Sequence, residues 1–164
     1  MKHLIVLVGN IGSGKSTYSK QYQEQGYIVV ARDQLRYAIG NGTYVFNMKY
    51  EPIIWRAEIR MFREFVEMGV NIIVDEVGLS KDHRKRYIPW AKKHNYKVTV
   101  IEMPKLSMKE SVERRMNNPH GQPDRNLWEQ IWTKFDTYYE SPSFSEGIDE
   151  IIRINRDGTN RTES

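Results

Sequence analysis

The sequence predicts an α/β fold in which helices cover both faces of a central parallel sheet of about five strands, a three-layer sandwich. Short apolar runs recur along the 164-residue chain, and segments with helical spacing separate each run from the next. This alternation is typical of βαβ units and of parallel sheets. The run within residues 71–76 has an unbroken apolar centre, as expected for a central strand buried on both faces. The length suits one hydrophobic core, so residues 1–164 are expected to form a single domain.

The first strand, helix and second strand can be placed from the residues that separate them. A strand is expected over residues 3–9 and a helix over residues 15–25. Gly26 then supplies the left-handed residue that commonly ends a helix. The second strand is expected over residues 27–31.

Two helices are expected in the next segment. Asp33 can serve as the N-cap of a short helix that stops at Gly40, and residues 41–50 read as a loop. A longer helix is expected over residues 51–68, where Pro52 suits the first turn. Apolar side chains in this helix recur at spacings of three and four and predict one buried face: Ile54, Ala57, Met61, Phe65 and Met68.

The remaining elements follow the same pattern. Further strands are expected over residues 71–76, 97–102 and 151–154. Further helices are expected from Ser80 to about residue 94, over residues 107–116 and over residues 124–139. Residues 117–123 are polar and rich in proline and glycine, which predicts a loop. The polar residues from about 157 to 164 are expected to be a disordered tail.

Composition excludes several kinds of site. The chain has no cysteine, so disulfides, thiolate nucleophiles and cysteine-based zinc sites are excluded, and its four histidines form no metal-binding pair. No apolar run is long enough to cross a membrane, and we expect a cytoplasmic protein with no obligate protein partner. The net charge of +4 is compatible with a polyanionic partner.

A complete phosphate-binding loop follows the first strand. The sequence fits G-x-x-x-x-G-K-S/T over the residues Gly9, Asn10, Ile11, Gly12, Ser13, Gly14, Lys15, Ser16 and Thr17. The glycines allow successive backbone N–H groups to point at phosphate oxygens, and the helix N-terminus adds partial positive charge. Lys15 is expected to reach the β- and γ-phosphates of ATP, Ser16 to bind Mg²⁺ and Thr17 to meet the α-phosphate. The alternative is a glycine-rich turn that only links strand to helix.

Two acidic residues follow strands at the edge of the sheet where ligands bind. Asp33 follows the second strand and could accept the proton of an attacking hydroxyl, while Arg36, three residues later, could neutralise charge on the phosphoryl group. An N-cap aspartate with a surface arginine is the alternative. Asp75 follows the third strand and is expected to support the Mg²⁺ sphere, the alternative being a cap for the next turn.

Residues 2–35 resemble the P-loop kinases of the 5′-hydroxyl polynucleotide kinase family. That family carries a G-x-x-G-S-G-K-S-T cradle and then an R-D-x-x-R segment, which here is Arg32-Asp33-Gln34-Leu35-Arg36. The resemblance implies a P-loop kinase-type fold, ATP and Mg²⁺ as cofactors, and a general base at Asp33. It also implies that Arg36 contacts the reacting phosphate or the substrate end.

The resemblance also implies a helical lid over ATP, expected at about residues 114–125, with Arg114 or Arg115 reaching the γ-phosphate. A further arginine of the family's lid is absent here or replaced by Arg125. A solvated helix face is the alternative for both lid arginines. Residues 139–151 are similar to the family's P-x-x-x-E-G-F-D-E-V ending, and the loop after the last strand often lines the adenine pocket.

One departure concerns the acceptor. Family members continue from the third strand with D-x-T-N-L-x-x-x-x-R, and here the aspartate and the arginine are present as Asp75 and Arg84, whereas Val77 and Gly78 replace the Thr-Asn pair. The D-x-x-G match to GTPases at residues 75–78 is treated as chance, because no N-K-x-D motif follows.

Three functions stay open from the sequence. The first is a kinase for the 5′-hydroxyl end of DNA or RNA, the second is a kinase for a nucleoside, nucleotide or sugar, and the third is an ATP-binding switch without kinase activity. Cationic and aromatic residues that could hold a nucleic acid are Arg56, Arg60, Arg63, Lys81, Arg84, Lys85, Arg86, Tyr44, Phe46, Tyr50 and Trp55. A solvated helix face and ordinary core packing are the alternatives for these residues.

Overall fold

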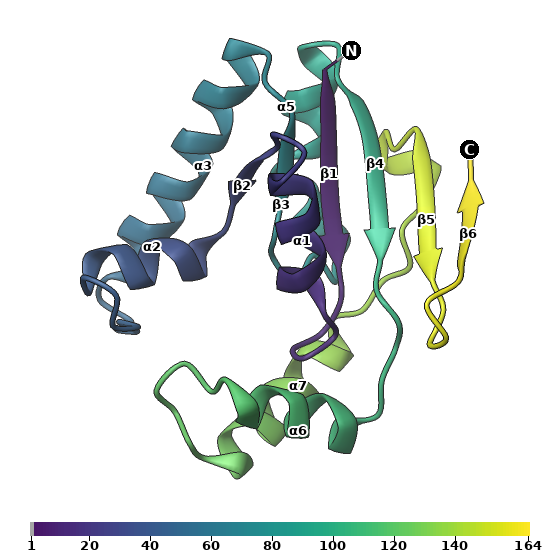
Figure 1. The fold of residues 1–164 in the computed structure, drawn as a ribbon. Helices are drawn as coiled ribbons and strands as arrows, with labels where there is room; N and C mark the ends of the chain where they lie inside the picture. The colour runs from purple at the N-terminus through teal and green to yellow at the C-terminus, as the bar shows by residue number, and fades with distance from the viewer. Residues whose placement is uncertain (1) are drawn as a thin grey trace.

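A computed structural model describes residues 2–164 and contains one six-stranded sheet in the order β2-β3-β1-β4-β5-β6 (Figure 1). The strands are β1 (His3–Val8), β2 (Ile28–Val30), β3 (Ile72–Val74), β4 (Lys97–Glu102), β5 (Glu150–Ile154) and β6 (Asn160–Glu163). The first five strands pair in parallel and β6 is antiparallel to β5. The predicted three-layer α/β fold is confirmed, with six strands in place of about five.

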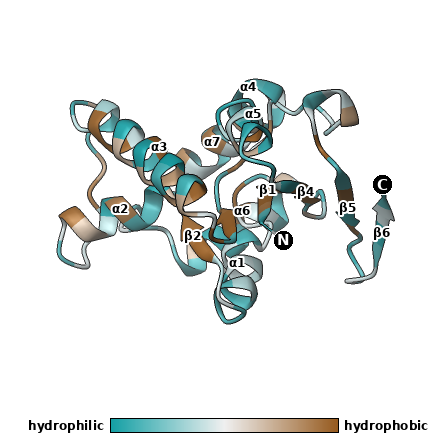
Figure 2. Ribbon diagram, turned by 90° about the horizontal axis from the view of Figure 1, so that it is seen from above, coloured by the Kyte–Doolittle hydropathy of each residue, from teal (hydrophilic) through white to brown (hydrophobic). Residues whose placement is uncertain are grey.

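Helices cover both faces of this sheet. They are α1 (Lys15–Gln23), α2 (Arg32–Ile39), α3 (Glu51–Met68), α4 (Lys81–Arg84), α5 (Ile88–Lys93), α6 (Met108–Asn117) and α7 (Arg125–Thr137), with a short 3-10 helix η1 (Phe144–Glu146). Figure 1 shows α1 in front of the sheet and α3 and α5 on the other side, while α6 and α7 lie beyond the ends of the strands. Seen from above, α3 and α5 again lie on the side of the sheet opposite to α1 (Figure 2).

The buried core divides along the alternation of β1. Leu4, Val6 and Val8 belong to the cluster that contains Phe62 of α3, whereas Ile5 and Leu7 belong to the cluster on the α1 side. Successive side chains of a strand point to opposite faces, so a strand buried on both faces must be apolar throughout. β1 meets this requirement and holds the start of the phosphate-binding loop in the middle of the sheet.

The segment predicted as one helix from Ser80 is two short helices. Ser80 is the N-cap of α4, since its hydroxyl accepts a hydrogen bond from the backbone N–H of His83 at 3.1 Å. The chain leaves the helix at Lys85 and re-enters it at α5, whose first turn contains Pro89. Proline lacks the N–H that a continuous helix would need there, so it fits only the first turn of a new helix.

The prediction of a disordered tail after about residue 157 is wrong for residues 160–163, which form β6. The turn before β6 closes with a hydrogen bond from the Asn155 N–H to the Thr159 carbonyl oxygen at 2.7 Å, and Gly158 supplies a positive φ of 83°. The strand then pairs with β5, with Thr162 opposite Ile152. Its polar residues gave no strand signal because β6 lies at the edge of the sheet.

A third, smaller cluster joins α6 and α7, which flank much of the segment predicted as a lid, to the loop after β1. Val112 of α6 and Trp128 of α7 are buried against Ile11. Residues 118–124 connect these helices and are called the lid loop below. In the part of the chain that the structure describes, no helix is both long and apolar enough to span a membrane.

Candidate functional site

The loop of residues 9–17, here called the phosphate cradle, has the backbone geometry that its glycines predict. Gly12 and Gly14 adopt φ of +66° and +99°, in the left-handed region that favours glycine. A Cβ at Gly12 would also overlap the carbonyl oxygen of Ser111, because the cradle packs directly against α6. The cradle and the lid helix are therefore in contact, and Gly12 is fixed by both backbone conformation and space.

Lys15 lies at the centre of the cradle, half-buried. Its ammonium group donates to the carbonyl oxygen of Asn10 at 2.8 Å and to the Ser13 hydroxyl at 3.5 Å. The pKa of Lys15 is lowered to about 8, chiefly by burial and also by the charge of Arg115, while Asp75 and Asp33 oppose the change. An anion bound beside Lys15 would restore the charged form, so this lysine is suited to a phosphate ligand.

The side chain of Asn10 points away from the cradle. Its amide nitrogen donates to the Trp132 carbonyl oxygen at 3.0 Å, and its amide oxygen accepts from the Ile11 N–H at 2.7 Å. Only the backbone carbonyl of Asn10 faces Lys15. Asn10 thus ties the cradle to α7.

The two predicted metal ligands lie on neighbouring parts of the fold, Ser16 in α1 and Asp75 just after β3. Ser16 is exposed in the first turn of α1, and Asp75 follows β3, where its N–H donates to the Val30 carbonyl oxygen at 2.9 Å. The Asp75 carboxylate accepts from the Ser19 hydroxyl at 2.8 Å, which holds it toward α1, so it does not act as the cap for the next turn. Residues 2–164 contain no cluster of three acidic or histidine side chains around a metal position. A hydroxyl and one carboxylate fit Mg²⁺, which usually takes few protein ligands and completes its shell with phosphate oxygens and water.

Asp33 lies in the first turn of α2, whose N-cap is Ala31, so Asp33 does not cap this helix. One carboxylate oxygen accepts from Arg36 at 2.7 Å and from the Tyr44 hydroxyl at 2.8 Å. Burial raises the pKa of Asp33, but the hydrogen bond from Tyr44 and the charge of Arg36 outweigh it and leave the pKa below its ordinary value. The side chain is still 45% exposed, so an ionised carboxylate faces the solvent-accessible side of the site.

Arg36 is held between two carboxylates. It donates to the two oxygens of Glu51 at 3.0 and 2.6 Å, in addition to its bond to Asp33. Only 11% of its side chain is exposed. Together Asp33, Arg36, Tyr44 and Glu51 form a continuous hydrogen-bonded group, here called the acceptor wall. A direct contact between Arg36 and a phosphate stays a prediction.

The structure distinguishes the two lid arginines. Arg114 is exposed, whereas Arg115 is partly buried with its guanidinium carbon 5.1 Å from the centre of the Trp128 ring. Burial lowers the pKa of Arg115, and the negative charge of Asp33 opposes this. The charge of Arg115 acts on Lys15 and lowers its pKa, so Arg115 is the arginine of α6 that lies on the cradle side.

The lid loop adds His120, which the sequence gave no reason to select. Its ring stacks on Tyr44 with centroids 4.6 Å apart and planes inclined by 18°. One ring nitrogen lies 2.6 Å from the Tyr37 hydroxyl and the other 2.6 Å from Arg115. Three residues of this region had no motif to reveal them: Tyr44 was noted only as a stacking candidate, Glu51 only as a helix start and His120 only as a position without arginine.

Val77 and Gly78, which stand where the family has its Thr-Asn pair, pack against the start of the cradle and the end of β1. The Val77 carbonyl oxygen accepts from the Gly9 N–H at 2.9 Å, so this segment pairs with the start of the cradle. Gly78 has φ of +55°, and a Cβ there would overlap the Leu7 carbonyl oxygen. The carboxylate of the neighbouring Glu76 accepts two hydrogen bonds from Arg32. The Arg32 backbone N–H donates one at 2.6 Å and the Arg32 guanidinium donates the other at 2.5 Å. The segment therefore serves packing and charge balance at this position.

Several of the proposed nucleic-acid contacts are occupied within the protein. Arg84 is fully buried and forms two hydrogen bonds with Glu146 at 2.7 and 2.8 Å, so it is unavailable to a nucleic acid. The Trp55 ring has the guanidinium groups of Arg32 and Arg86 at 3.9 Å each. Trp55 is therefore already engaged by two cations. Phe46 and Tyr50 are 55% and 46% exposed, and the Phe46 ring has the Arg36 guanidinium 5.7 Å from its centre.

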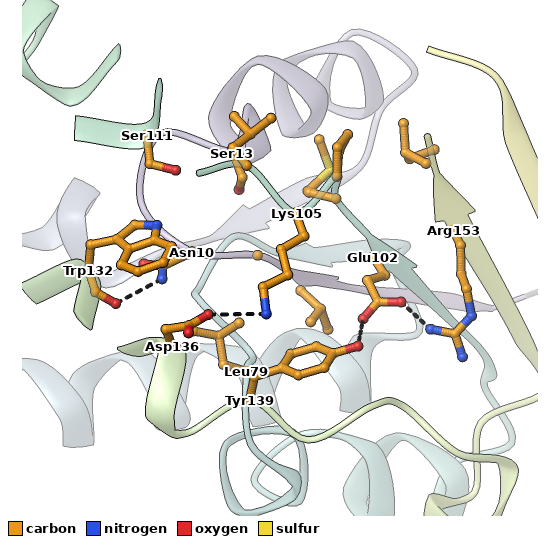
Figure 3. A pocket seen from close by; sticks show the side chains of 16 residues that line it. Asn10, Ser13, Leu79, Glu102, Lys105, Ser111, Trp132, Asp136, Tyr139 and Arg153 are labelled. Carbon is orange, nitrogen blue, oxygen red and sulfur yellow. Dashed lines mark hydrogen bonds and ion pairs between the residues drawn. The ribbon is translucent and has the colours of Figure 1, made fainter. Parts of the chain in front are cut away.

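A cavity of about 210 Å³ adjoins the cradle on the side of α7 (Figure 3). Its walls come from the cradle, the segment between β4 and α6, α7 and the end of β5. Lys105 and Asp136 form an ion pair at 3.4 Å, and Glu102 accepts from both Tyr139 and Arg153. Neither Lys15 nor Asp33 lines this cavity, so it lies beside the space between these two residues and not within it.

Comparisons with known proteins show what this chain is similar to. A model of the AAA domain family matches residues 4–138. The chain is 30% identical over 125 residues to a protein of Autographa californica nuclear polyhedrosis virus that is named as a bifunctional polynucleotide kinase/RNA ligase, covering 69% of this chain and 18% of that protein. It is 26% identical over 172 residues to the dephospho-CoA kinase of Clostridium tetani, covering 93% of this chain and 68% of that protein.

Among solved structures, the APS kinase CysC of Mycobacterium tuberculosis, in complex with AMPPNP and APS, superposes with a TM-score of 0.60. The identity is 19%, and the superposition covers 96% of this chain and 90% of that chain. At this identity the likeness shows a shared fold. The chain spans 18% of the length of the viral relative, which is a much longer protein.

Proposed function

The chain belongs to the AAA domain family of P-loop kinases, and on that premise we propose that it transfers the γ-phosphate of ATP to the 5′-hydroxyl end of DNA or RNA. P-loop kinases use ATP with Mg²⁺ and differ chiefly in the acceptor that they place opposite the phosphate cradle. The question for this chain is therefore which substrate binds with its hydroxyl beside the acceptor wall.

The observation that carries the proposal is the state of Asp33. Its carboxylate is kept ionised by Arg36 and Tyr44, and its charge acts on both Lys15 of the cradle and Arg115 of the lid. An ionised carboxylate at this place can accept the proton of an attacking hydroxyl. A structural N-cap would not need these partners, and Asp33 does not cap α2.

The remaining roles follow from position. The cradle N–H groups and Lys15 hold the phosphates, and Ser16 with Asp75 would hold Mg²⁺, which neutralises charge between the β- and γ-phosphates. The oxygen of the acceptor hydroxyl bonds to the γ-phosphorus. Asp33 takes the proton of that hydroxyl at the same time. The bond from that phosphorus to the bridging oxygen breaks, and ADP leaves with the electron pair. Arg115 is placed to stabilise charge on the phosphoryl group in flight.

Two observations support a nucleic-acid end as the acceptor. The viral relative is named for polynucleotide kinase activity. In this chain Phe46 is exposed beside the acceptor wall, with its ring 5.7 Å from the Arg36 guanidinium, and Tyr50 is exposed a few residues on. Exposed aromatic rings beside cations are the usual platform on which unpaired bases stack.

A small-molecule acceptor is the second candidate. The similarity to dephospho-CoA kinase extends over 93% of this chain and favours it. The engagement of Arg84 and Trp55 within the protein also favours it, because both are lost as nucleic-acid contacts. A small acceptor would need only the acceptor wall and the lid.

The deciding experiment offers γ-labelled ATP and Mg²⁺ to a single-stranded oligonucleotide with a 5′-hydroxyl, beside the same oligonucleotide with a 5′-phosphate. Labelling of only the first is the expected result. Labelling of both would place the phosphate on a base or a 3′-hydroxyl and would contradict the proposal. No labelling of either, with ATP bound, would favour the small-molecule candidate, to be followed by nucleosides, dephospho-CoA and sugars as acceptors.

A further inference from the structure

His120 of the lid loop contacts both Arg115 of α6 and the Tyr44 ring of the acceptor wall. This residue has a φ of 50°, in the left-handed region, and Gly121 after it has a φ of 72°. The turn brings the imidazole against α2 and the loop that follows it, while Arg115 of α6 still reaches it. His120 contacts the ring of Tyr44, the hydroxyl of Tyr37 and the guanidinium of Arg115.

The partners of His120 define its protonation state. A guanidinium can only donate hydrogen bonds, so the nitrogen Nε2, which lies 2.6 Å from Arg115, must be an acceptor without a proton. Nδ1 then carries the proton and donates to the Tyr37 hydroxyl at 2.6 Å. This assignment comes from the chemistry of the partners. In this arrangement His120 is neutral.

The charges around His120 favour the same state. Arg115 of α6 and Arg36 of α2 are positive, and Asp33 of α2 is negative at 3.7 Å from Nε2. Tyr37 and Tyr44 are neutral, and Trp128 of α7 contributes an apolar ring with its centre 6.4 Å away. Burial and the charge of Arg115 lower the pKa of His120 below its ordinary value of 6.5, and Asp33 only partly opposes them.

We propose that neutral His120 is a positioning residue that latches the lid loop onto α2 and orients Arg115 toward the cradle, and that its protonation releases the latch. A protonated imidazole cannot accept from Arg115 and would set a second cation beside it. Arg115 would then lose its hydrogen bond and be pushed away from the site. For catalysis this inference rests on the proposed phosphoryl transfer, whereas the latch itself does not depend on the acceptor.

The direction of the pH effect follows from the lowered pKa. The open lid leaves His120 with a pKa near 6.5, so the open state binds the proton better than the latched state. The latch is at full strength above pH 6.5 and weakens as the pH falls from there toward the lowered pKa. Asp33 does not titrate in this window, because its pKa lies below its ordinary value of 3.8.

The first test measures the pH profile of phosphoryl transfer in His120→Gln, which offers an acceptor and a donor but no titration. The wild-type kcat is expected to fall below pH 6.5 by up to about tenfold per pH unit, the limit for one proton, and His120→Gln is expected to lose this fall. His120→Ala removes the latch and is expected to lower kcat by about 10- to 100-fold at pH 8, the cost of a misplaced group. His94→Gln, a change at the end of α5, is the matched control.

The second test needs no acceptor and stays informative if the proposed function fails. The chain has no cysteine, so Ala38→Cys on α2 and Gln122→Cys in the lid loop, both exposed, can carry the only two spin labels. The distance between the labels is expected to be narrowly distributed at pH 8 and longer or broader at pH 5.5. Adding His120→Gln should abolish this change. A distance that does not respond to pH, or that responds equally with His120→Gln, would overturn the latch.

Discussion

The phosphate cradle takes its shape from the backbone of consecutive residues between β1 and α1, whereas the acceptor wall takes its shape from side chains of three segments. In the cradle, positive φ at Gly12 and Gly14 and the start of α1 arrange the N–H groups. In the acceptor wall, Asp33 is held by one residue of its own helix and by Tyr44 from the following loop. The proposed donor site is thus shaped mainly by main chain, and the proposed acceptor site by side-chain contacts.

This difference has a functional consequence. A main-chain site for phosphate is tolerant of side-chain changes outside its glycines and lysine, and it suits any reaction that starts from a nucleoside triphosphate. A side-chain site changes with each residue that supports it. Substitutions on the two sides should therefore separate: those in the cradle should reduce ATP binding and transfer together, and those in the acceptor wall should reduce transfer alone.

The largest effect is expected for Lys15→Ala in the cradle. Loss of a cation from the transferred phosphoryl group should lower the transfer rate by about 10³- to 10⁵-fold, and ATP binding should weaken as well. Steady-state kinetics with labelled ATP and calorimetric titration of ATP measure the two effects. Lys20→Ala, on the exposed side of the same helix, should leave both unchanged. Transfer at the wild-type rate by Lys15→Ala would remove the cradle from the mechanism.

Asp33→Asn tests the acceptor wall with little change in shape. The amide cannot take a proton from the acceptor, so kcat should fall by about 10²- to 10⁴-fold. Calorimetric titration should give an unchanged affinity for ATP, in contrast to Lys15→Ala. Gln34→Ala, at the exposed neighbouring position, is the control. A loss of ATP affinity as large as that of Lys15→Ala would contradict the role of Asp33 as the base.

Arg115→Ala and Arg114→Ala compare the buried and exposed arginines of α6. Removal of a charge that stabilises the transferring phosphoryl group should lower kcat by about 10²- to 10³-fold in Arg115→Ala. Arg114→Ala should retain wild-type kinetics, because Arg114 is exposed. The kcat values of the two variants, measured side by side, test whether Arg115 and not Arg114 acts on the phosphoryl group. Equal losses of kcat in both variants would contradict this assignment.

The smallest effect is expected for Phe46→Ala and separates the two candidate acceptors. Loss of one base-stacking ring should raise the KM for an oligonucleotide by about tenfold, within the range for one stacked base. The KM for a small acceptor should not change. Phe144→Ala, which removes a ring of similar exposure from η1, is the control. An oligonucleotide KM that is equal in Phe46→Ala and the wild type would argue against stacking at this surface.

The cradle could be predicted from the sequence because its residues are contiguous and each type has a single physical role there. The parallel strands could be predicted because their apolar runs are buried on both faces. Asp33 and Asp75 were selected because each comes within a few residues of the end of a strand, at the edge where ligands bind. Their partners were different: Ser19 and Tyr44 carry no motif, and only the folded chain brings them to these carboxylates.

Charged residues were the hardest to interpret from sequence. Arg84 looks like part of a basic surface cluster, but the structure buries it against Glu146, which is far away in the sequence. Glu146 belongs to the segment that resembles the ending of the kinase family. Arg84 of the basic cluster and Glu146 of this segment therefore form one buried ion pair. A charge in a helix does not reveal whether it faces solvent, because its partner can lie anywhere along the chain.

The polar strand β6 protects the rest of the sheet. Its residues Asn160, Arg161, Thr162 and Glu163 cover the outer side of β5, which carries Ile151, Ile152 and Ile154. A chain trimmed before β6 would leave the backbone of an apolar strand open to pairing with another molecule, which is the usual route to edge-to-edge aggregation. Charged residues on β6 make it a poor template for a further strand. The short strand therefore covers an edge at which another molecule could otherwise add a strand.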